Sequence, residues 1–323
     1  MTRPLSWLGT LLLATLAPSN AQDAANSDVN AIQLRTHSLQ APYLDSDMQS
    51  RWFDFGGSTI VRADQYIRLT GQQPSQSGWI FSRVPLTATN WEVEIEFNIH
   101  GTGSLWGDGM AIWFTKERGE QGPVFGMKDY FEGLGIFVDT YKNDRPGVVF
   151  PYVMAMLGDG KTKYDKDNDG RANELGGCSA RGLRNAEIPT RMKITYFQDQ
   201  NLVVNLGYKK ENHWTNCFEV KDVKLPQVVF LGLSAETGEL SDNHDIIKVE
   251  TKNLYSPSGQ KSSTPGPAGS KDYSRDKYTQ AQTQKKAKGS WLLFFGQILL
   301  VILVAGAAYV GFTFYRAQRR DRF

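Results

Sequence analysis

Acidic and amide side chains gather in two short segments on either side of an apolar run. One segment spans residues 139–144 and reads Asp-Thr-Tyr-Lys-Asn-Asp, and the other spans residues 165–170 and reads Asp-Lys-Asp-Asn-Asp-Gly. Carboxylates and amide carbonyls are the hard oxygen donors that Ca²⁺ binds, with backbone carbonyls and water completing a set of about six to eight ligands. The pattern predicts a Ca²⁺ site that ties two loops together and shapes a ligand site beside them.

The second segment also matches the start of an EF-hand loop. Asp165, Asp167 and Asp169 followed by Gly170 occupy the first, third, fifth and sixth positions of that motif. The last ligand position falls on Gly176, where a bidentate Glu is required, and the preceding residues alternate as in a strand. These departures disfavour an EF-hand, and a solvated acidic turn is the remaining alternative to a Ca²⁺ site.

Three glutamates could form a hydrolytic site. Glu92, Glu94 and Glu96 share one face of a strand, and retaining glycosidases place two carboxyl groups about 5–5.5 Å apart. A solvated outer face accounts for alternating Glu equally well. The sequence lacks Gly-x-Ser-x-Gly, His-Glu-x-x-His and phosphate-binding Gly motifs, which favours binding over catalysis.

Composition and the two ends predict a membrane protein of the secretory pathway. The formal net charge of +2 over 323 residues makes nucleic acid an unsuitable partner. Residues 1–21 have the charge and apolar run of a signal peptide, and residues 291–315 carry no charge and are long enough for a membrane helix. Residues 256–290 are expected to form a flexible stalk, and residues 316–323 a basic cytoplasmic tail of a type I protein.

The part between these ends, residues 31–255, is written in short strand-like runs broken by Gly, Asn, Asp and Pro. The run from Trp91 to Ile99 alternates strictly, so its apolar side chains are expected to face a second sheet. Further strands are predicted at 109–115, 134–139, 192–197, 202–206, 228–235 and 246–251. We therefore expect an all-β fold, an antiparallel β-sandwich of the jelly-roll kind, with function in the loops at one end.

Two cysteines, Cys178 and Cys217, lie in the segment expected to face the oxidising lumen. A disulfide between them is predicted, and a pair of buried free thiols is the alternative. The sequence has no Asn-x-Ser/Thr sequon, so the chain could read N-glycans without carrying any.

Several loop segments lie at the boundaries of predicted strands and are expected to converge at one rim. They are residues 107–109, 139–143, 165–169 and 238–240. Asp and Asn oxygens held by Ca²⁺ can accept hydrogen bonds from vicinal sugar hydroxyls, and backbone N–H groups add donors. The ring of Phe114, Tyr141 or Phe150 could stack on the apolar face of a sugar.

These same segments resemble the legume-like L-type lectins of the early secretory pathway. The resemblance is carried by residues 107–113, 122–126, 136–141, 150–152, 164–165 with 169–171, and 237–245. It covers about residues 31–255, and it implies a non-enzymatic, Ca²⁺-dependent receptor for mannose and high-mannose N-glycans on glycoproteins that travel between the endoplasmic reticulum and the Golgi.

The resemblance also implies roles for individual residues. Ca²⁺ would be held by Asp139, the backbone carbonyl of Tyr141, Asn143 and Asp169. Mannose would be held by Asp108, Asn143, the loop Gly238, Glu239 and Leu240, and Ser75. The family has a disulfide where Cys178 and Cys217 stand, and lectins of this fold often have a cis peptide bond before the residue that corresponds to Asp108.

One position departs from the family pattern. Animal members have a sugar-binding His where this chain has Lys166, and Lys can donate but cannot accept a hydrogen bond. The alternative function is therefore a member with impaired sugar binding that acts as a structural or adaptor subunit of transport vesicles. Arg319, Arg320 and Phe323 in the tail suggest contacts with vesicle coats and a location in the endoplasmic reticulum, the intermediate compartment or the Golgi.

Overall fold

The computed structural model describes residues 30–255, which include the whole predicted lectin-like domain. The predicted signal peptide (1–21), stalk (256–290), membrane helix (291–315) and tail (316–323) lie outside the described residues. Within residues 30–255 no helix has the length and apolar character that crossing a membrane requires.

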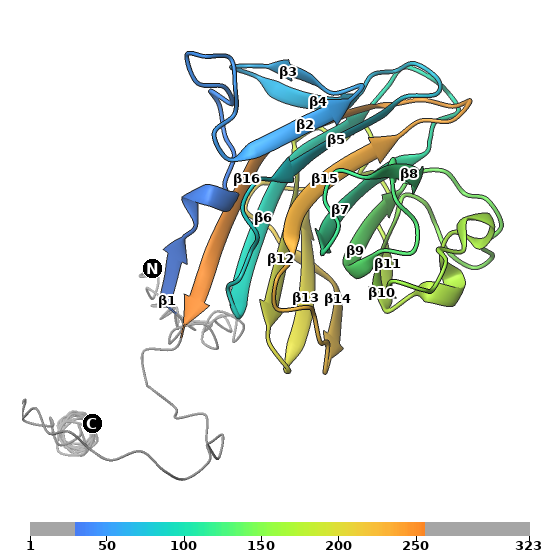
Figure 1. Cartoon of the computed structure of the whole chain (residues 1–323). Helices are drawn as coiled ribbons and strands as arrows, with labels where there is room; N and C mark the ends of the chain where they lie inside the picture. Colours follow the sequence, from blue (N-terminus) through green and yellow to red (C-terminus); the bar gives the residue numbers. More distant parts are fainter. Residues whose placement is uncertain (1–29, 256–323) are drawn as a thin grey trace, which may run out of the picture. The chain divides into compact units, whose positions relative to one another are not determined.

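The described chain forms two antiparallel sheets, as expected of a sandwich (Figure 1). The eight-stranded sheet contains β14 (Thr215–Lys221), β13 (Asn201–Gly207), β12 (Thr190–Phe197), β6 (Asn90–His100), β16 (Asn243–Tyr255), β4 (Tyr66–Thr70) and β3 (Ile60–Arg62) in that order, with β1 (Asn30–Gln33) paired to β16. The seven-stranded sheet contains β11 (Gly176–Ser179), β10 (Tyr152–Asp159), β9 (Glu132–Asp139), β7 (Gly109–Thr115), β15 (Phe230–Glu236), β5 (Ser77–Ser82) and β2 (Phe53–Gly57).

Short elements complete the fold. They are β8 (Gln121–Val124) and the 3₁₀ turns η2 (Arg35–His37), η3 (Lys166–Asn168) and η4 (Arg171–Asn173). The two last turns lie in the long connection between β10 and β11, which supplies part of the site described below.

The alternation along β6 builds the core between the sheets. Buried and half-buried residues alternate along its whole length, and Trp91 and Ile99 are among those that face inward. The Trp91 ring stacks on Phe114 of the opposite sheet with ring centroids 4.2 Å apart. The predicted sandwich is therefore confirmed, but Phe114 lies inside it and is unavailable to a sugar.

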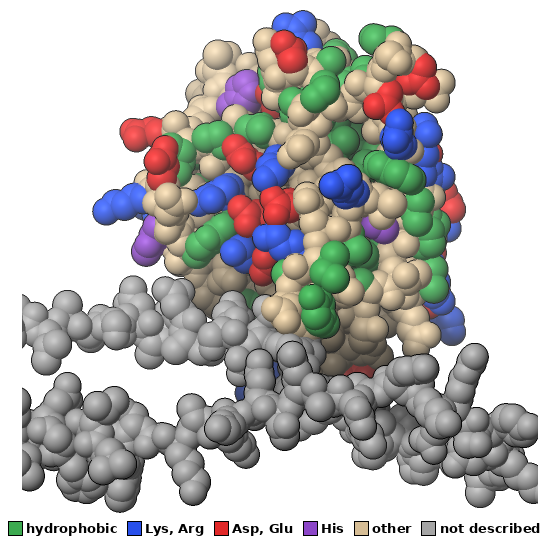
Figure 2. All heavy atoms as spheres, turned by 90° about the vertical axis from the view of Figure 1, so that its left-hand side faces the viewer, with side chains coloured by type: hydrophobic (Ala, Val, Ile, Leu, Met, Phe, Trp, Pro, Cys, Tyr) green, Lys and Arg blue, Asp and Glu red, His purple; other side chains and the backbone are tan. Residues whose placement is uncertain are grey.

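The glutamates of β6 point to the outer face of the eight-stranded sheet. Glu92 lies 3.7 Å from the Lys252 ammonium, and Glu94 lies 3.7 Å from the Arg191 guanidinium, so cations from neighbouring strands pair with these carboxylates. Figure 2 shows acidic and basic side chains interleaved on one face of the molecule. This arrangement is a solvated, charge-balanced surface, as the alternative reading of the alternating Glu pattern predicted.

The other sheet is covered on both faces along β7 and β9. All residues of β7 and nearly all of β9 are buried. An aromatic layer lies over the outward face, where the ring of Phe137 is 5.2 Å from that of Phe125 and 4.9 Å from that of Tyr164. This layer anchors the loops that carry Phe125 and Tyr164 against the strands that they border.

The predicted disulfide is present. Cys178 in β11 and Cys217 in β14 are bonded, and these two strands form edges of the two different sheets. The bond therefore closes one side of the sandwich covalently.

Candidate functional site

Strand register brings three acidic residues to one end of the seven-stranded sheet. Asp139 at the end of β9 lies opposite Gly109, and Gly109 lies opposite Glu236 at the end of β15. Asp108, directly before Gly109, follows a cis peptide bond, as expected from the resemblance. Its backbone N–H donates to the Glu236 carbonyl at 3.1 Å, and its carbonyl accepts from the Thr140 N–H at 2.9 Å. Asp108 is thus fixed between the two neighbouring strands.

The residues expected to hold Ca²⁺ converge beside it. The Asn143 backbone N–H donates to both Asp169 carboxylate oxygens at 3.0 and 3.2 Å, and its side-chain amide donates to one of them at 2.7 Å. The Tyr141 backbone N–H donates to the Asp139 carboxylate at 3.1 Å. The two acidic segments that lie far apart along the hairpin are therefore joined through Asn143 and Asp169.

The carboxyl groups of Asp139 and Asp169 are electrostatically suited to a bound cation. Burial raises the pKa of the Asp139 carboxyl well above its usual range, and the neighbouring Asp169 carboxylate raises it further. Burial also raises the pKa of Asp169. Two buried carboxylates that repel each other fit a divalent ion, and an amide and a backbone carbonyl are the further hard oxygens that Ca²⁺ prefers. In residues 30–255 no group of three or more His, Cys, Asp or Glu side chains is arranged to hold a metal.

A buried arginine that the sequence did not reveal supports the metal-side loop. The Arg145 guanidinium donates to the Asp169 carbonyl at 3.0 Å, pairs with Glu174 and lies 4.2 Å above the Tyr152 ring. Gly170 follows at φ +68°, and a Cβ there would lie 2.6 Å from the Tyr164 ring. The turn after Asp169 therefore requires glycine at this position.

The segment that precedes Asp165 is a strand followed by a turn, which excludes an EF-hand helix. The Asp165 carboxylate accepts from the Asn168 side-chain amide at 2.9 Å, within its own turn. Of the three aspartates in that motif, Asp169 is the one directed to Asn143.

The loop expected to bind sugar, residues 238–240, approaches Asp108 from the end of β15. A Cβ on Gly238 would be 3.2 Å from an Asp108 carboxylate oxygen, and one on Gly107 would be 3.6 Å from Leu240. The Ser75 N–H donates to the Gly238 carbonyl at 2.9 Å, so Ser75 supports this loop through its backbone. Glu239 at the tip is exposed.

Some of the expected site residues line a cavity of about 100 Å³, whereas Ser75, Asp169, Gly238, Glu239 and Leu240 lie outside its lining. Its lining consists of Asp108, Pro123, Phe125, Asp139, Tyr141, Asn143, Tyr164, Lys166 and Glu236. Larger hollows of about 320 and 620 Å³ border the 225–228 segment, but neither gathers this set of carboxylate and amide oxygens. Tyr141 is thus the one proposed stacking residue that lines the cavity, because Phe114 is in the core and Phe150 packs towards Tyr152.

Glu236 was missed by sequence reasoning. It ends the strand one residue later than predicted, directly before the Thr237-Gly238 turn. The signal that could have identified it is an acidic residue at the mouth of an otherwise apolar strand.

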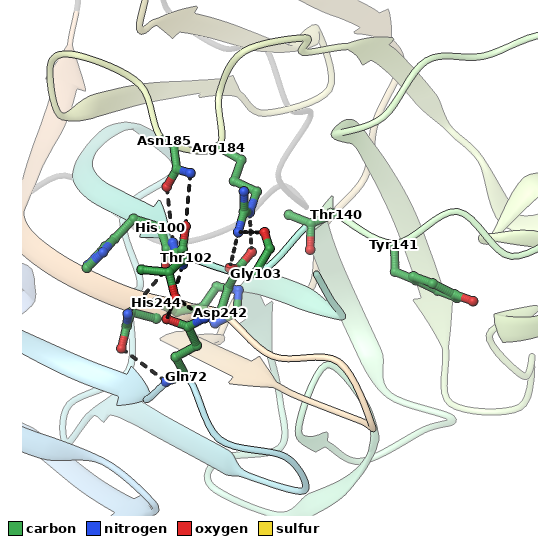
Figure 3. A network of polar contacts seen from close by, with 12 residues as sticks. Gln72, His100, Thr102, Gly103, Thr140, Tyr141, Arg184, Asn185, Asp242 and His244 are labelled. Atoms are coloured by element: carbon green, nitrogen blue, oxygen red, sulfur yellow. Dashed lines mark hydrogen bonds and ion pairs between the residues drawn. The ribbon is translucent and has the colours of Figure 1, made fainter. Parts of the chain in front are cut away.

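A network of polar contacts fixes the loop that leads to Asp108 (Figure 3). The Asn185 side chain donates to the Gly101 carbonyl and accepts from its N–H, each at 3.0 Å. Arg184 donates to the Gly103 carbonyl at 3.3 Å and pairs through two nitrogens with the buried Asp242. The network therefore joins residues 101–107 to the segment that follows Leu240.

Comparison with known proteins places this geometry in a family. The family model described as the legume-like lectin family matches residues 30–261. An L-type lectin-like domain-containing protein of Schizosaccharomyces pombe is 40% identical over 219 residues, which are 67% of this chain and 70% of that protein. The VIP36-like protein of Homo sapiens is 43% identical over 222 residues, which are 67% of this chain and 63% of that protein.

Solved structures agree. The VIP36 exoplasmic/lumenal domain in its Ca²⁺/Man-bound form is 43% identical with a TM-score of 0.66, over 69% of this chain and 92% of that one. Its metal-free form gives a TM-score of 0.64 at 40% identity, over 70% of this chain and 99% of that one. Together with the matched family model, these likenesses establish that the chain belongs to the legume-like lectin family.

Proposed function

We propose that this chain is a Ca²⁺-dependent receptor for mannose and high-mannose N-glycans that carries glycoproteins between the endoplasmic reticulum and the Golgi. The observation that carries the proposal is one cavity in which Asp139 and Asn143 of the metal cluster border Asp108 of the sugar side. Related VIP36 domains have been solved in Ca²⁺/Man-bound and Ca²⁺/Man3GlcNAc-bound forms, which supports both ligands. The family consists of carbohydrate-binding proteins, and the chain is not an enzyme.

The proposed binding mechanism follows from the contacts of each residue. Bound Ca²⁺ would neutralise the repulsion between the Asp139 and Asp169 carboxylates and hold the Asn143 loop in place. The Asn143 amide nitrogen already donates to Asp169, which leaves its oxygen available as a ligand. The Asp108 carboxylate beside Gly238 would accept hydrogen bonds from sugar hydroxyls, and Leu240 and the Tyr141 ring would cover apolar sugar surface.

The architecture around the domain is part of the same proposal. A signal peptide at 1–21, a stalk at 256–290 and a membrane helix at 291–315 would place the lectin domain in the lumen. The tail at 316–323 would contact vesicle coats, and the chain would cycle among the endoplasmic reticulum, the intermediate compartment and the Golgi. The name of the related vesicular integral-membrane protein VIP36 of Mus musculus, 40% identical over 252 residues, supports this arrangement.

The second candidate is an adaptor with impaired sugar binding, which would follow if the Lys166 ammonium at the wall of the cavity cannot replace a sugar-binding His that also accepts hydrogen bonds. A glycan hydrolase is disfavoured, since Glu92 and Glu94 pair with surface cations and line no part of the cavity. Glycan hydrolysis should stay at background in the wild type and in variants with Glu92, Glu94 or Glu96 replaced by Gln. Hydrolysis by the wild type that is lost in one of these variants would instead support the enzyme hypothesis.

The decisive experiment is a calorimetric titration of the purified full chain with a high-mannose glycan, with Ca²⁺ and again after chelation. Binding that disappears on chelation and with Asp108→Ala is the expected result. Ca²⁺ binding without any glycan binding would instead support the adaptor.

A further inference from the structure

Lys166 and Glu236 face each other across the wall of the sugar cavity, although they are 70 positions apart in the chain. Lys166 begins η3 and Glu236 ends β15. Both line the cavity together with Asp108 and Asn143. The two residues therefore present an ammonium and a carboxylate to whatever occupies this space.

Their geometry leaves both groups able to bind a further polar group. The Lys166 Nζ lies 3.7 Å from Glu236 Oε1, which is longer than a direct hydrogen bond, and 3.4 Å from the Pro123 carbonyl. The second Glu236 oxygen, Oε2, accepts from the Gly126 N–H at 3.2 Å. Glu236 is thus held by the backbone through Oε2, while Oε1 faces the ammonium across a gap.

A role in folding does not explain the pair. The side chains of Lys166 and Glu236 are 49% and 22% exposed, and an ion pair with that much solvent contributes little to stability. Burial raises the pKa of the Asp108 carboxyl, and the charge of Lys166 opposes that rise, so Lys166 acts on the sugar side of the site.

We propose that Lys166 and Glu236 together bind one free hydroxyl of the glycan, with Lys166 donating to the hydroxyl oxygen and the hydroxyl donating to Glu236 Oε1. A hydroxyl both accepts and donates, whereas an ether or glycosidic oxygen only accepts. The pair would therefore select a neutral mannose residue whose hydroxyl at this position is unsubstituted.

This inference deepens the proposed function and rests on it. The test is a double-mutant cycle of Lys166→Met and Glu236→Ala in the purified full chain, titrated with methyl α-mannoside and with the series in which each hydroxyl is singly O-methylated. The exposed pair Lys116 and Glu132, at the opposite end of β7 and β9, supplies matched controls as Lys116→Met and Glu132→Ala. Ca²⁺ affinity and melting temperature are measured for every variant to show that each is folded.

Each single variant should lose roughly tenfold or more in mannoside affinity, since a hydrogen bond to a charged group is lost. The mannoside affinity of the double variant should be only slightly lower than that of the single variant that binds more weakly, because both residues bind the same hydroxyl. One O-methylated mannoside should bind the wild type poorly. The double variant should bind that mannoside and the unmethylated parent with equal affinity. The control variants should bind like the wild type.

Two other outcomes overturn the inference in distinguishable ways. If the wild type binds mannosides and the Lys166 and Glu236 variants bind them with equal affinity and the same hydroxyl pattern, the pair is a surface ion pair only. If the wild type binds Ca²⁺ but no mannoside, the proposed function fails and this inference fails with it.

Discussion

The Arg184 guanidinium holds both carboxylate oxygens of Asp242, with Nε and Nη2 each 2.8 Å from one oxygen. The Asp242 side chain is fully buried, and it follows Leu240 of the proposed sugar loop by two positions. The same guanidinium lies 4.3 Å above the Trp106 ring, directly before Gly107 and Asp108. One ion pair thus sets the distance between the two loops on the sugar side of the cavity.

Asp242→Asn should therefore weaken both the fold and sugar binding. Leaving a buried guanidinium without its charge partner costs about 3 kcal/mol of unfolding free energy, measured by urea denaturation. Mannose affinity should fall while Ca²⁺ affinity is kept, because the metal cluster lies on the other side of Asp108. Asp45→Asn, in an exposed ion pair with Arg51, is the control and should cost less than about 1 kcal/mol. Unchanged mannose affinity in Asp242→Asn would mean that the ion pair serves the fold alone.

Asp139→Asn should have opposite effects with and without Ca²⁺. In the presence of a chelator the melting temperature should rise, because the substitution removes a buried charge that Asp169 repels. With Ca²⁺ present, affinity for the ion should fall by roughly tenfold or more, since Ca²⁺ sites are tuned by ligand charge. Calorimetry and thermal melts at two Ca²⁺ concentrations measure both effects. A lower melting temperature in chelator would contradict the inferred repulsion.

Acid should destabilise the domain through His244. Burial lowers the pKa of this histidine to about 3, and its Nδ1 lies 2.7 Å from Thr70 Oγ1. The unfolded chain takes up the proton below about pH 6.5 while the folded chain does not, so stability falls as the pH drops from 6.5 towards 3. The loss reaches roughly 3 kcal/mol at pH 4.5, from about 1.4 kcal/mol for each pH unit. Urea denaturation between pH 4.5 and 7.5 measures it.

The groups that face His244 from neighbouring positions are Asp245 and His100. Desolvation raises the pKa of Asp245, but its hydrogen bonds to Arg68 and His100 outweigh it and leave the pKa lowered, so its contribution is lost only below about pH 4. His244→Phe should flatten the stability profile between pH 6.5 and 4.5. A profile as steep as that of the wild type would assign the acid sensitivity to another group.

Reduction of the Cys178–Cys217 bond should lower the free energy of unfolding by about 4 kcal/mol in the chain-entropy model. The bond closes a loop between residues 39 positions apart, so its loss lets the unfolded chain adopt more conformations. Urea midpoints with and without reductant measure the change. The double variant Cys178→Ala, Cys217→Ala should be insensitive to reductant, and a reductant effect that persists in it would point to a cause outside the disulfide.

The strands of the sandwich could be predicted from the sequence because their signals are local. The alternation of β6 fixes which side chains are buried, and β7 was predicted with the bounds that the structure has. The proposed Ca²⁺ ligands Asp139 and Asp169 stood out for a related reason, since both stand in dense runs of oxygen-bearing residues in the sequence.

The groups that sequence reasoning missed depend on pairing between distant segments. Glu236 reaches the cavity because β15 pairs with β7, and Arg184 meets Asp242 from 58 positions away. Phe114 was misplaced because β7 is apolar on both faces, so the sequence of that strand does not tell which face points into the core.

The pairing of β1 with β16 has a consequence for how the lectin presents itself. Asn30 lies opposite Tyr255, so the described chain begins and ends at one pole of the domain. The sugar loop lies just before the other end of β16, whose 13 residues span about 40 Å at roughly 3.3 Å per residue. One end of β16 therefore carries both ends of the described chain, and the other end carries the proposed sugar loop.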